Sequence, residues 1–232
     1  MTPPQLRDEA VLSGSSYYNQ SARTARRAPE LKAYSAMKRL MDIAGSAIGL
    51  FLLSPLLVLI AILIKLEDPK GPILFKQTRI GKNGKTFQMY KLRSMVVNAE
   101  EKLAELLHKN EINGAMFKMK DDPRITRVGK FIRKTSLDEL PQLLNVLRGE
   151  MSLVGPRPPL GREVAEYTEH DKKRLSVTPG CTGLWQVSGR NKLSFDEMVE
   201  LDIAYIEQRS LLLDMKILVR TVKEVVAPQN AF

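Results

Sequence analysis

Residues 43–64 read IAGSAIGLFLLSPLLVLIAILI, and these 22 positions contain no charged side chain. A helix needs about 20 consecutive apolar residues to cross the hydrocarbon core of a bilayer. Apolar residues would lie on all sides of a helix built from this stretch, so a chain of 232 residues could hardly enclose it in a core. We therefore predict that this segment enters a membrane.

Ser54 and Pro55 lie at the midpoint of the segment. Proline removes one backbone hydrogen bond and bends or breaks a helix, and a serine hydroxyl can satisfy the carbonyl that is freed. Basic residues flank both ends of the segment, at Lys32, Lys38, Arg39, Lys65, Lys70 and Lys76. Because these charges favour neither side for translocation, we predict a re-entrant helix-break-helix with both ends in the cytoplasm. A proline-kinked helix that spans the bilayer is the open alternative.

The composition of the whole chain is that of a globular protein with excess positive charge. Lys+Arg number 36 and Asp+Glu 26, which gives a net charge of +10, with 44% apolar and 27% charged residues. These values exclude a polytopic transporter and a disordered chain, and they favour anionic partners. The single cysteine, Cys181, and two isolated histidines exclude an internal disulfide and a zinc-type ligand set, which indicates a cytoplasmic location.

The chain is predicted to divide into a flexible arm at 1–36, a re-entrant membrane helix at 37–66 and a cytoplasmic domain at 67–232. Asn83-Gly84, between two short apolar runs, is a strong signal for a β-hairpin. Residues 96–109 and 211–226 have helical patterns, and Ser194-x-x-Glu197 is a capping box that opens another helix. The predicted fold class is therefore α+β, mostly helical, with a small β-hairpin.

A run of cations leads into a pair of carboxylates, Asp138 and Glu139. The cations are Arg124, Arg127, Lys130, Arg133 and Lys134. In a purely structural interpretation, Asp138 caps a helix that has Pro141 in its first turn and ends before Gly149. The same position would let the helix N-terminus and the cations keep Asp138 ionised. An ionised Asp138 could attack phosphorus while Glu139 holds a divalent cation, and both interpretations stay open.

Two further regions are candidates for phosphate binding. Arg157 stands in Gly155-Pro156-Arg157-Pro158, where two prolines fix the backbone around a guanidinium suited to bidentate phosphate recognition. Lys91 and Arg93 lie at the end of the second predicted strand. Residues 179–190, PGCTGLWQVSGR, form either a structural loop or part of a nucleotide site.

These motifs, taken in order, resemble the monotopic phosphoglycosyl transferases, also called bacterial sugar transferases. The matching pieces are Lys38-Arg39-Leu40-Met41-Asp42, the apolar segment with Ser54-Pro55, Tyr90-Lys91-Leu92-Arg93-Ser94-Met95, Ser136-Leu137-Asp138-Glu139-Leu140-Pro141-Gln142-Leu143, Gly155-Pro156-Arg157-Pro158 and Pro179-Gly180 through Gly189-Arg190. The likeness runs from about Lys38 to Pro228.

The resemblance implies transfer of a hexose 1-phosphate from a UDP-hexose to a polyprenol phosphate such as undecaprenyl phosphate, with release of UMP. This reaction would begin exopolysaccharide, capsule or O-antigen type synthesis at the cytoplasmic face of the bacterial inner membrane. By the same resemblance Asp138 forms a covalent phosphosugar intermediate and Glu139 helps to bind Mg²⁺. Lys91, Arg133 and Arg157 are then expected to bind phosphate, and Gln186 and Arg190 the nucleotide.

Two other functions remain as alternatives. A membrane-anchored basic module could bind acidic lipid or nucleic acid without chemistry, and the net charge of +10 supports it. Cations gathered around a carboxylate pair argue against a pure anion binder, and we expect no nucleic acid among the partners. A membrane phosphatase, in which water resolves the intermediate, is the second alternative. The sequence does not name the sugar, and glucose or galactose is the expectation.

Overall fold

The computed structural model describes residues 5–106, 108, 119, 121–189 and 193–226. The chain divides into two compact units, Met1–Met41 and Asp42–Phe232. Helix α1 (Gln5–Glu67) continues through both, so most of the range predicted as a flexible arm is helical. Alanine and arginine recur in this range and are good helix formers, which explains a helix that lacks a regular apolar stripe. The division into arm, membrane segment and domain stays a prediction.

The later part of α1 is apolar and exposed. Residues Lys32–Glu67 are long and apolar enough to cross a membrane, by length and composition. Within unit 2, the side chains of Phe51, Leu52 and Leu66 are 79%, 66% and 73% exposed. So much exposed apolar surface on one helix is typical of a segment that contacts lipid.

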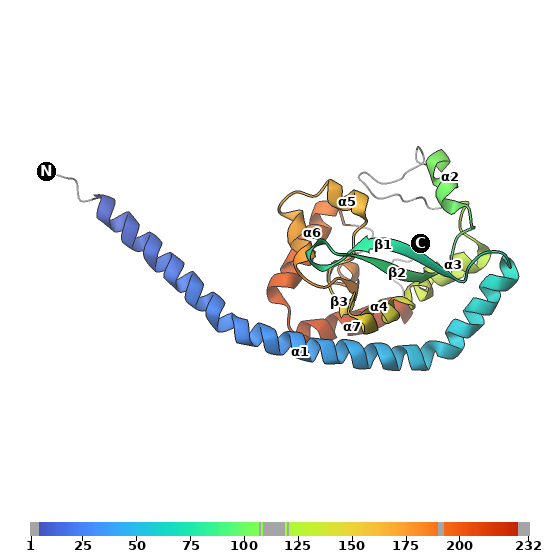
Figure 1. The fold of residues 1–232 in the computed structure, drawn as a ribbon, viewed down its shortest axis with the longest axis horizontal. Coiled ribbons are helices and arrows are strands. Elements are labelled where there is room, and N and C mark those ends of the chain that lie inside the picture. Colours follow the sequence, from blue (N-terminus) through green and yellow to red (C-terminus); the bar gives the residue numbers. More distant parts are fainter. Residues whose placement is uncertain (1–4, 107, 109–118, 120, 190–192, 227–232) are drawn as a thin grey trace. The chain divides into compact units, whose positions relative to one another are not determined.

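Pro55 bends α1 and does not end it. The helix continues through this position, and Figure 1 shows it changing direction within unit 2, in its light-blue to cyan part. The Ser54 hydroxyl donates a hydrogen bond of 2.8 Å to the Phe51 carbonyl, the acceptor that a backbone amide at position 55 would have used. The predicted role of Ser54 is thus confirmed, whereas the predicted break is a bend.

One face of α1 is docked on the rest of unit 2. Asp42 is only 4% exposed, and it accepts hydrogen bonds of 3.0 Å from the Ser152 hydroxyl and the Leu153 amide. Towards its C-terminal end the helix joins a buried apolar cluster formed by Ile60, Ile64, Leu92 and Ile132. These contacts fix the helix to the domain while its opposite face stays exposed.

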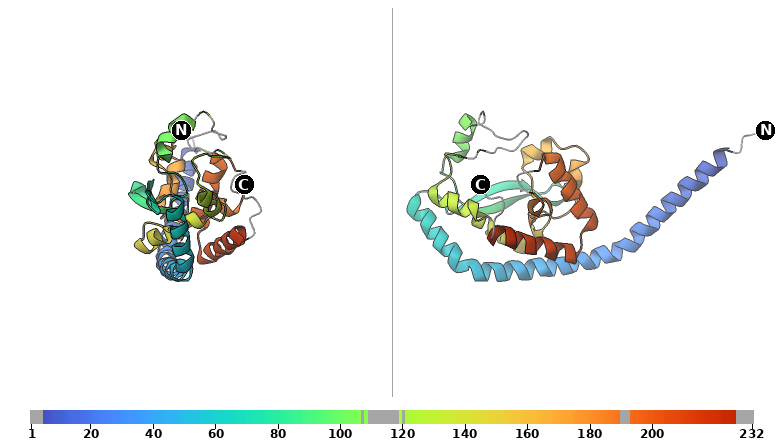
Figure 2. Two further views of the ribbon diagram at one scale, coloured as in Figure 1. Left: turned by 90° about the vertical axis from the view of Figure 1, so that its right-hand side faces the viewer. Right: turned by 180° about the vertical axis from the view of Figure 1, so that it is seen from behind.

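The predicted β-hairpin is confirmed. Strands β1 (Leu74–Ile80) and β2 (Thr86–Leu92) pair antiparallel, with Leu74 opposite Leu92. Asn83 and Gly84 take positive φ values of 56° and 77°, as the tight turn between twisted strands requires. Figure 2 shows the hairpin extending across unit 2 from the end of α1 to the side of α5 and α6.

The other described elements are mostly short helices. They are α2 (Ala99–Leu106), α3 (Arg127–Lys134), η3 (Leu137–Glu139), α4 (Gln142–Arg148), α5 (Gly161–Ala165), η4 (Asp171–Ser176), η5 (Trp185–Val187), α6 (Phe195–Gln208) and α7 (Leu211–Val226). The predicted capping box opens α6, since the Ser194 amide donates to Glu197 at 2.7 Å and the Glu197 amide to Ser194 at 3.3 Å.

A second two-stranded sheet was not predicted. Strand β3 (Ser152–Val154) pairs parallel with β4 (Gly180–Thr182). The buried cluster of Val154, Tyr205 and Ile217 packs α6 and α7 against β3. This small core holds the turn after β3 and the loop after β4 next to each other.

Candidate functional site

The two carboxylates of the predicted dyad lie in a short 3-10 helix, η3. Ser136 takes a left-handed conformation with φ of 56° and starts this turn, so Asp138 is inside η3. Helix α4 begins later, at Gln142, and the preceding Pro141 supplies no side-chain cap. The interpretation of Asp138 as the cap of α4 is therefore wrong, whereas Gly149, with φ of 82°, ends α4 as predicted.

Asp138 is buried, and its surroundings set its pKa. Its residue is 8% exposed, and burial raises the pKa of its carboxyl group from 3.8 to about 6. Glu139 raises this pKa as well, while Lys91 and Arg133 lower it. The cations favour the ionised form, as expected, but desolvation outweighs them, so the pKa is raised and not lowered. At pH 7 about nine tenths of Asp138 is still ionised.

The Glu139 side chain lines a pocket beside Asp138. Its Oε1 lies 2.6 Å from Lys91 Nζ, and its side chain is 39% exposed. The pocket has about 280 Å³ of empty space, part of it open to solvent. Its lining residues are Arg79, Met89, Lys91, Glu139, Gln142, Arg157, Pro158, Gly180, Cys181 and Gln186. The structure thus brings Lys91, Glu139, Arg157 and Gln186 together.

The remaining predicted residues take other positions. Arg133 belongs to α3 and acts on Asp138 through its charge. Arg190 lies outside the described residues. Arg93 pairs with Asp68 and also donates to the Asp68 carbonyl at 2.9 Å, so it holds the chain just after α1. Arg93 is therefore held by Asp68 and is not among the residues that line the pocket.

Gly180 at the start of β4 and Gly183 just after it allow two backbone segments to approach closely. A Cβ on Gly180 would lie 2.1 Å from the Gly155 nitrogen, and one on Gly183 would lie 2.5 Å from the Gly155 oxygen. The Gly180 amide donates to the Pro156 carbonyl at 2.8 Å. These glycines therefore have a structural role, through which the loop presents Gln186 to the same pocket as Arg157.

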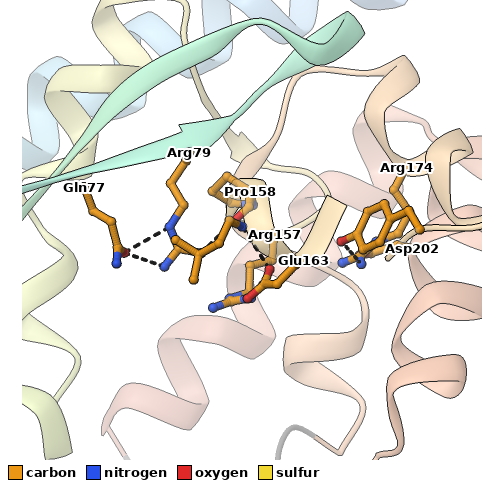
Figure 3. Close-up of polar contacts among 9 residues, drawn as sticks. Gln77, Arg79, Arg157, Pro158, Glu163, Arg174 and Asp202 are labelled. Carbon is orange, nitrogen blue, oxygen red and sulfur yellow. Dashed lines mark hydrogen bonds and ion pairs between the residues drawn. The ribbon is translucent and has the colours of Figure 1, made fainter. Parts of the chain in front are cut away.

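Arg79 is a site residue that sequence reasoning missed. Its Nε and Nη2 donate to Gln77 Oε1 at 3.1 and 2.6 Å, and its Nη1 donates to the Pro158 carbonyl at 3.0 Å. Figure 3 shows Arg79 reaching from β1 between Gln77 and Pro158, with Arg157 and Glu163 beyond. The only signal in the sequence is an arginine near the end of an otherwise ordinary strand.

Asp138 and Glu139 are adjacent carboxylates, and Mg²⁺ in a phosphate site needs only one or two carboxylates from the protein. Among the described residues, no group of three or more His, Cys, Asp or Glu side chains could hold a metal ion. Mg²⁺ in phosphate sites usually keeps several waters and takes one or two carboxylates together with substrate oxygens. Glu139, partly exposed in the pocket, suits such a site only when substrate phosphates supply the other ligands.

Similarity to known proteins shows the family to which the chain belongs. A family model described as bacterial sugar transferase matches residues 33–228. The chain belongs to the bacterial sugar transferase family. The match includes every residue of the pocket and the later part of α1.

Several curated proteins are similar to this chain over 84% of its length. Galactosyl transferase CpsE of Streptococcus agalactiae is 51% identical over 195 residues, and the undecaprenyl-phosphate galactose phosphotransferase of Salmonella typhimurium is 46% identical over 200. The matched part is 43% and 42% of those two proteins. Exopolysaccharide production protein ExoY of Sinorhizobium fredii is 42% identical over 199 residues, and 88% of it is covered.

Proposed function

We propose that the protein transfers a hexose 1-phosphate from a UDP-hexose to a polyprenol phosphate, such as undecaprenyl phosphate, and releases UMP. The observation that carries this proposal is the pocket in which Lys91, Arg79 and Arg157 surround Glu139, next to the buried Asp138. Both substrates are phosphate anions, which a cationic pocket attracts. The names of the relatives, which include an undecaprenyl-phosphate galactose phosphotransferase, support the same reaction class.

The reaction is proposed to proceed in two steps through Asp138. An oxygen of its carboxylate attacks the sugar-linked phosphorus of the UDP-hexose, and the bond from that phosphorus to the bridging oxygen breaks, so that UMP leaves with the electron pair. A phosphate oxygen of the polyprenol phosphate then attacks the same phosphorus. The Asp138 carboxylate is released, and the product is a polyprenol diphosphohexose. One phosphate site can serve both substrates in turn.

The pocket residues have distinct parts in these steps. Lys91 and Arg157 neutralise and orient the phosphates, and Gln186 offers an amide to the nucleotide. Glu139 would hold Mg²⁺, which when bound neutralises charge that builds up on the phosphate oxygens. The partial burial of Asp138 keeps the nucleophile away from bulk water, which favours transfer to lipid over hydrolysis.

The exposed faces of two helices support a position of the site at a membrane surface. Besides α1, helix α7 presents exposed apolar side chains at Leu212, Met215, Val219 and Val222. The other exposed positions on α7 within 211–224 are the basic Lys216, Arg220 and Lys223, and none is acidic. Figure 2 places α7 at the same lower edge of unit 2 as α1. Such a face suits the surface of an anionic bilayer.

We infer that α1 enters the cytoplasmic face of a bacterial inner membrane as a re-entrant bend and returns to the same side. The Ser54-Pro55 bend and the flanking cations support this path. Single cysteines placed before Lys38 and after Lys70, in a background lacking Cys181, should share one labelling pattern with an impermeant reagent in sealed cells. Opposite labelling of the two positions would show a spanning helix.

The proposed product begins a surface glycan of the exopolysaccharide, capsule or O-antigen type. Galactose or glucose is the proposed sugar, in line with the galactose named for two relatives and the glucose named for a phosphotransferase of Komagataeibacter xylinus. A UMP-release assay with purified protein, Mg²⁺, undecaprenyl phosphate and a panel of UDP-sugars tests the function. We expect UMP and a lipid-linked diphosphosugar in equal amounts. Free hexose phosphate without lipid product would instead indicate a phosphatase.

A further inference from the structure

The pocket holds three cations whose local charge balance differs. Lys91 pairs with Glu139 at 2.6 Å, and Arg157 lies 3.6 Å from Glu163. Arg79 is only 6% exposed, yet its hydrogen-bond acceptors are the Gln77 side-chain oxygen and the Pro158 carbonyl, which are both neutral. Among the residues that the structure describes, no carboxylate oxygen lies within 4.0 Å of the Arg79 guanidinium. Arg79 is therefore a buried charge without an ion-pair partner.

A buried charge of this kind is unfavourable, and the carboxylates of Glu163 and Glu139 offset the cost only in part, through their charge. Burial and the nearby charge of Arg157 lower the pKa of Arg79 to about 10, so the guanidinium stays protonated at neutral pH. A guanidinium carries five N–H groups, and three of those on Arg79 are used by Gln77 and Pro158. One N–H on each terminal nitrogen is left for a ligand. Arg157 lines the same pocket and repels Arg79, and the Glu163 carboxylate beside Arg157 offsets only part of this repulsion.

We propose that Arg79 and Arg157 together bind the diphosphate group of a nucleoside diphosphate ligand, with Arg79 as the deep anchor of this site. The inference rests on the proposed function and deepens it by assigning its diphosphate subsite. The guanidinium is held in place before the ligand arrives, because Gln77 fixes one edge and the Ile80 amide donates to the Pro159 carbonyl at 2.9 Å. Preorganised donors of this kind lose little entropy on binding.

The proposal explains why residue 77 is a glutamine and not a glutamate. The Gln77 oxygen orients Arg79 by two hydrogen bonds and leaves its positive charge unneutralised. A glutamate has almost the same shape but would form a bidentate ion pair with Arg79 and compete with a bound diphosphate. Gln77→Glu should therefore weaken diphosphate binding and stabilise the free protein. A purely structural Arg79 predicts that this change leaves binding unaffected.

The test measures the binding of UDP, UMP and inorganic pyrophosphate to the purified full chain by titration calorimetry, together with the melting temperature. Arg79→Met should weaken UDP binding about 10- to 100-fold and UMP binding much less, because only UDP presents the diphosphate. Gln77→Glu should weaken UDP binding in the same direction. Neither change should lower the melting temperature of the free protein. Arg162→Met is the matched control, since Arg162 is exposed and acts on Arg79 only through its charge.

The outcomes separate this inference from the proposed function. Parent and Arg79→Met proteins that bind UDP equally would overturn the inference and leave the function standing. Equal losses of UDP and UMP binding with a lower melting temperature would show that Arg79 is structural. Pyrophosphate binding that needs Arg79, without any preference for UDP over pyrophosphate, would support the anion site but contradict a UDP-sugar donor. A parent that binds none of the three probes contradicts both.

Discussion

Two arginines of unit 2 are each 6% exposed, but their surroundings give them different roles. Arg174 donates from Nε and Nη2 to Asp202 Oδ2 at 2.9 and 2.6 Å, and from Nη1 to the Tyr167 hydroxyl at 2.9 Å. Arg79 donates only to neutral oxygens and lines the pocket. Figure 3 includes both arginines. Burial alone therefore does not distinguish a structural arginine from a ligand-binding one. The charge of the hydrogen-bond partners does, because Arg174 is paired with a carboxylate and Arg79 is not.

The charge of the partners determines how each region responds when a charged side chain is removed. The charges of Arg174 and Asp202 balance each other in a buried ion pair. Removing either member leaves an uncompensated buried charge and destabilises the fold. The pocket has cations in excess, so a bound anion stabilises it and the free protein tolerates the loss of one cation.

Replacing a buried aspartate by asparagine should have opposite effects in the two regions. Asp138→Asn should lower turnover by at least about 10³-fold, because the amide is not a competent nucleophile. Burial raises the pKa of Asp202 to about 6 as well, but Asp202→Asn also leaves the buried Arg174 guanidinium without a counter-charge. It should therefore leave the chemistry intact in the folded fraction and destabilise the protein, by about 3 kcal/mol. Single-turnover UMP release and chemical denaturation measure the two quantities.

The stability of Asp138→Asn also has a predicted sign. Because the pKa of Asp138 is raised from 3.8 to about 6 in the folded state, the folded protein binds more protons than the unfolded chain between these values. This contribution to stability is present at low pH and is lost as the pH rises through 6. At pH 8 the asparagine variant should therefore be more stable than the parent, by up to about 3 kcal/mol. A less stable variant would show that the buried carboxylate supports the fold.

The two arginines provide the second test of the contrast. Arg174→Met should destabilise the protein by about 3 to 5 kcal/mol, because Asp202 is 0% exposed and loses its partner. Arg79→Met should cause no loss of stability in the absence of ligand. Urea unfolding of both variants measures the difference. Similar losses for the two would mean that Arg79 is as structural as Arg174.

Glu139→Gln should lower kcat about 10- to 100-fold and weaken the response to Mg²⁺, because an oxygen anion beside the phosphates is lost. Glu197→Gln is the control, since Glu197 is exposed in the capping box of α6, away from the pocket. UMP release measured over a range of Mg²⁺ concentrations distinguishes the two variants. The prediction fails if Glu139→Gln keeps the Mg²⁺ dependence of the parent.

The rate of the first step should follow the ionisation of Asp138. With a pKa of about 6, the rate at pH 5 should be about one tenth of that at pH 7, and it should level off above pH 7. The lipid acceptor is omitted so that its own phosphate does not contribute to the profile. Glu139→Gln removes a charge that raises this pKa, so its profile should shift to lower pH. A profile that is flat between pH 5 and 7 would contradict a raised pKa for the nucleophile.

Local patterns in the sequence predicted the elements that depend on neighbouring residues. Asn83-Gly84 turns the hairpin, Ser194 and Glu197 form the capping box, and Gly149 ends α4. Each depends on backbone conformations and hydrogen bonds within a few positions, which residue type controls directly. The same holds for the Ser54 hydroxyl and the Phe51 carbonyl.

Long-range packing determined what the sequence did not show. The parallel pair β3–β4 joins segments of three residues each, too short for any periodicity. Asp138 could be located as a carboxylate near cations, but its burial depends on the packing of β2 and α3 around η3. Lys91 and Arg93 are equally basic neighbours, yet one faces the pocket and the other pairs with Asp68. Arg79 joins the site because the segment after β3 is hydrogen-bonded to the end of β1, through the Pro158 and Pro159 carbonyls.

A covalent intermediate on Asp138 is the central claim, and mass spectrometry after rapid quenching tests it most directly. The parent protein is mixed with a UDP-hexose and Mg²⁺ in the absence of polyprenol phosphate. We predict about one equivalent of UMP per active protein and the added mass of one hexose phosphate on the peptide that contains Asp138, with neither observed for Asp138→Asn. UMP that forms only after the lipid is added, or a label on another residue, would contradict this account.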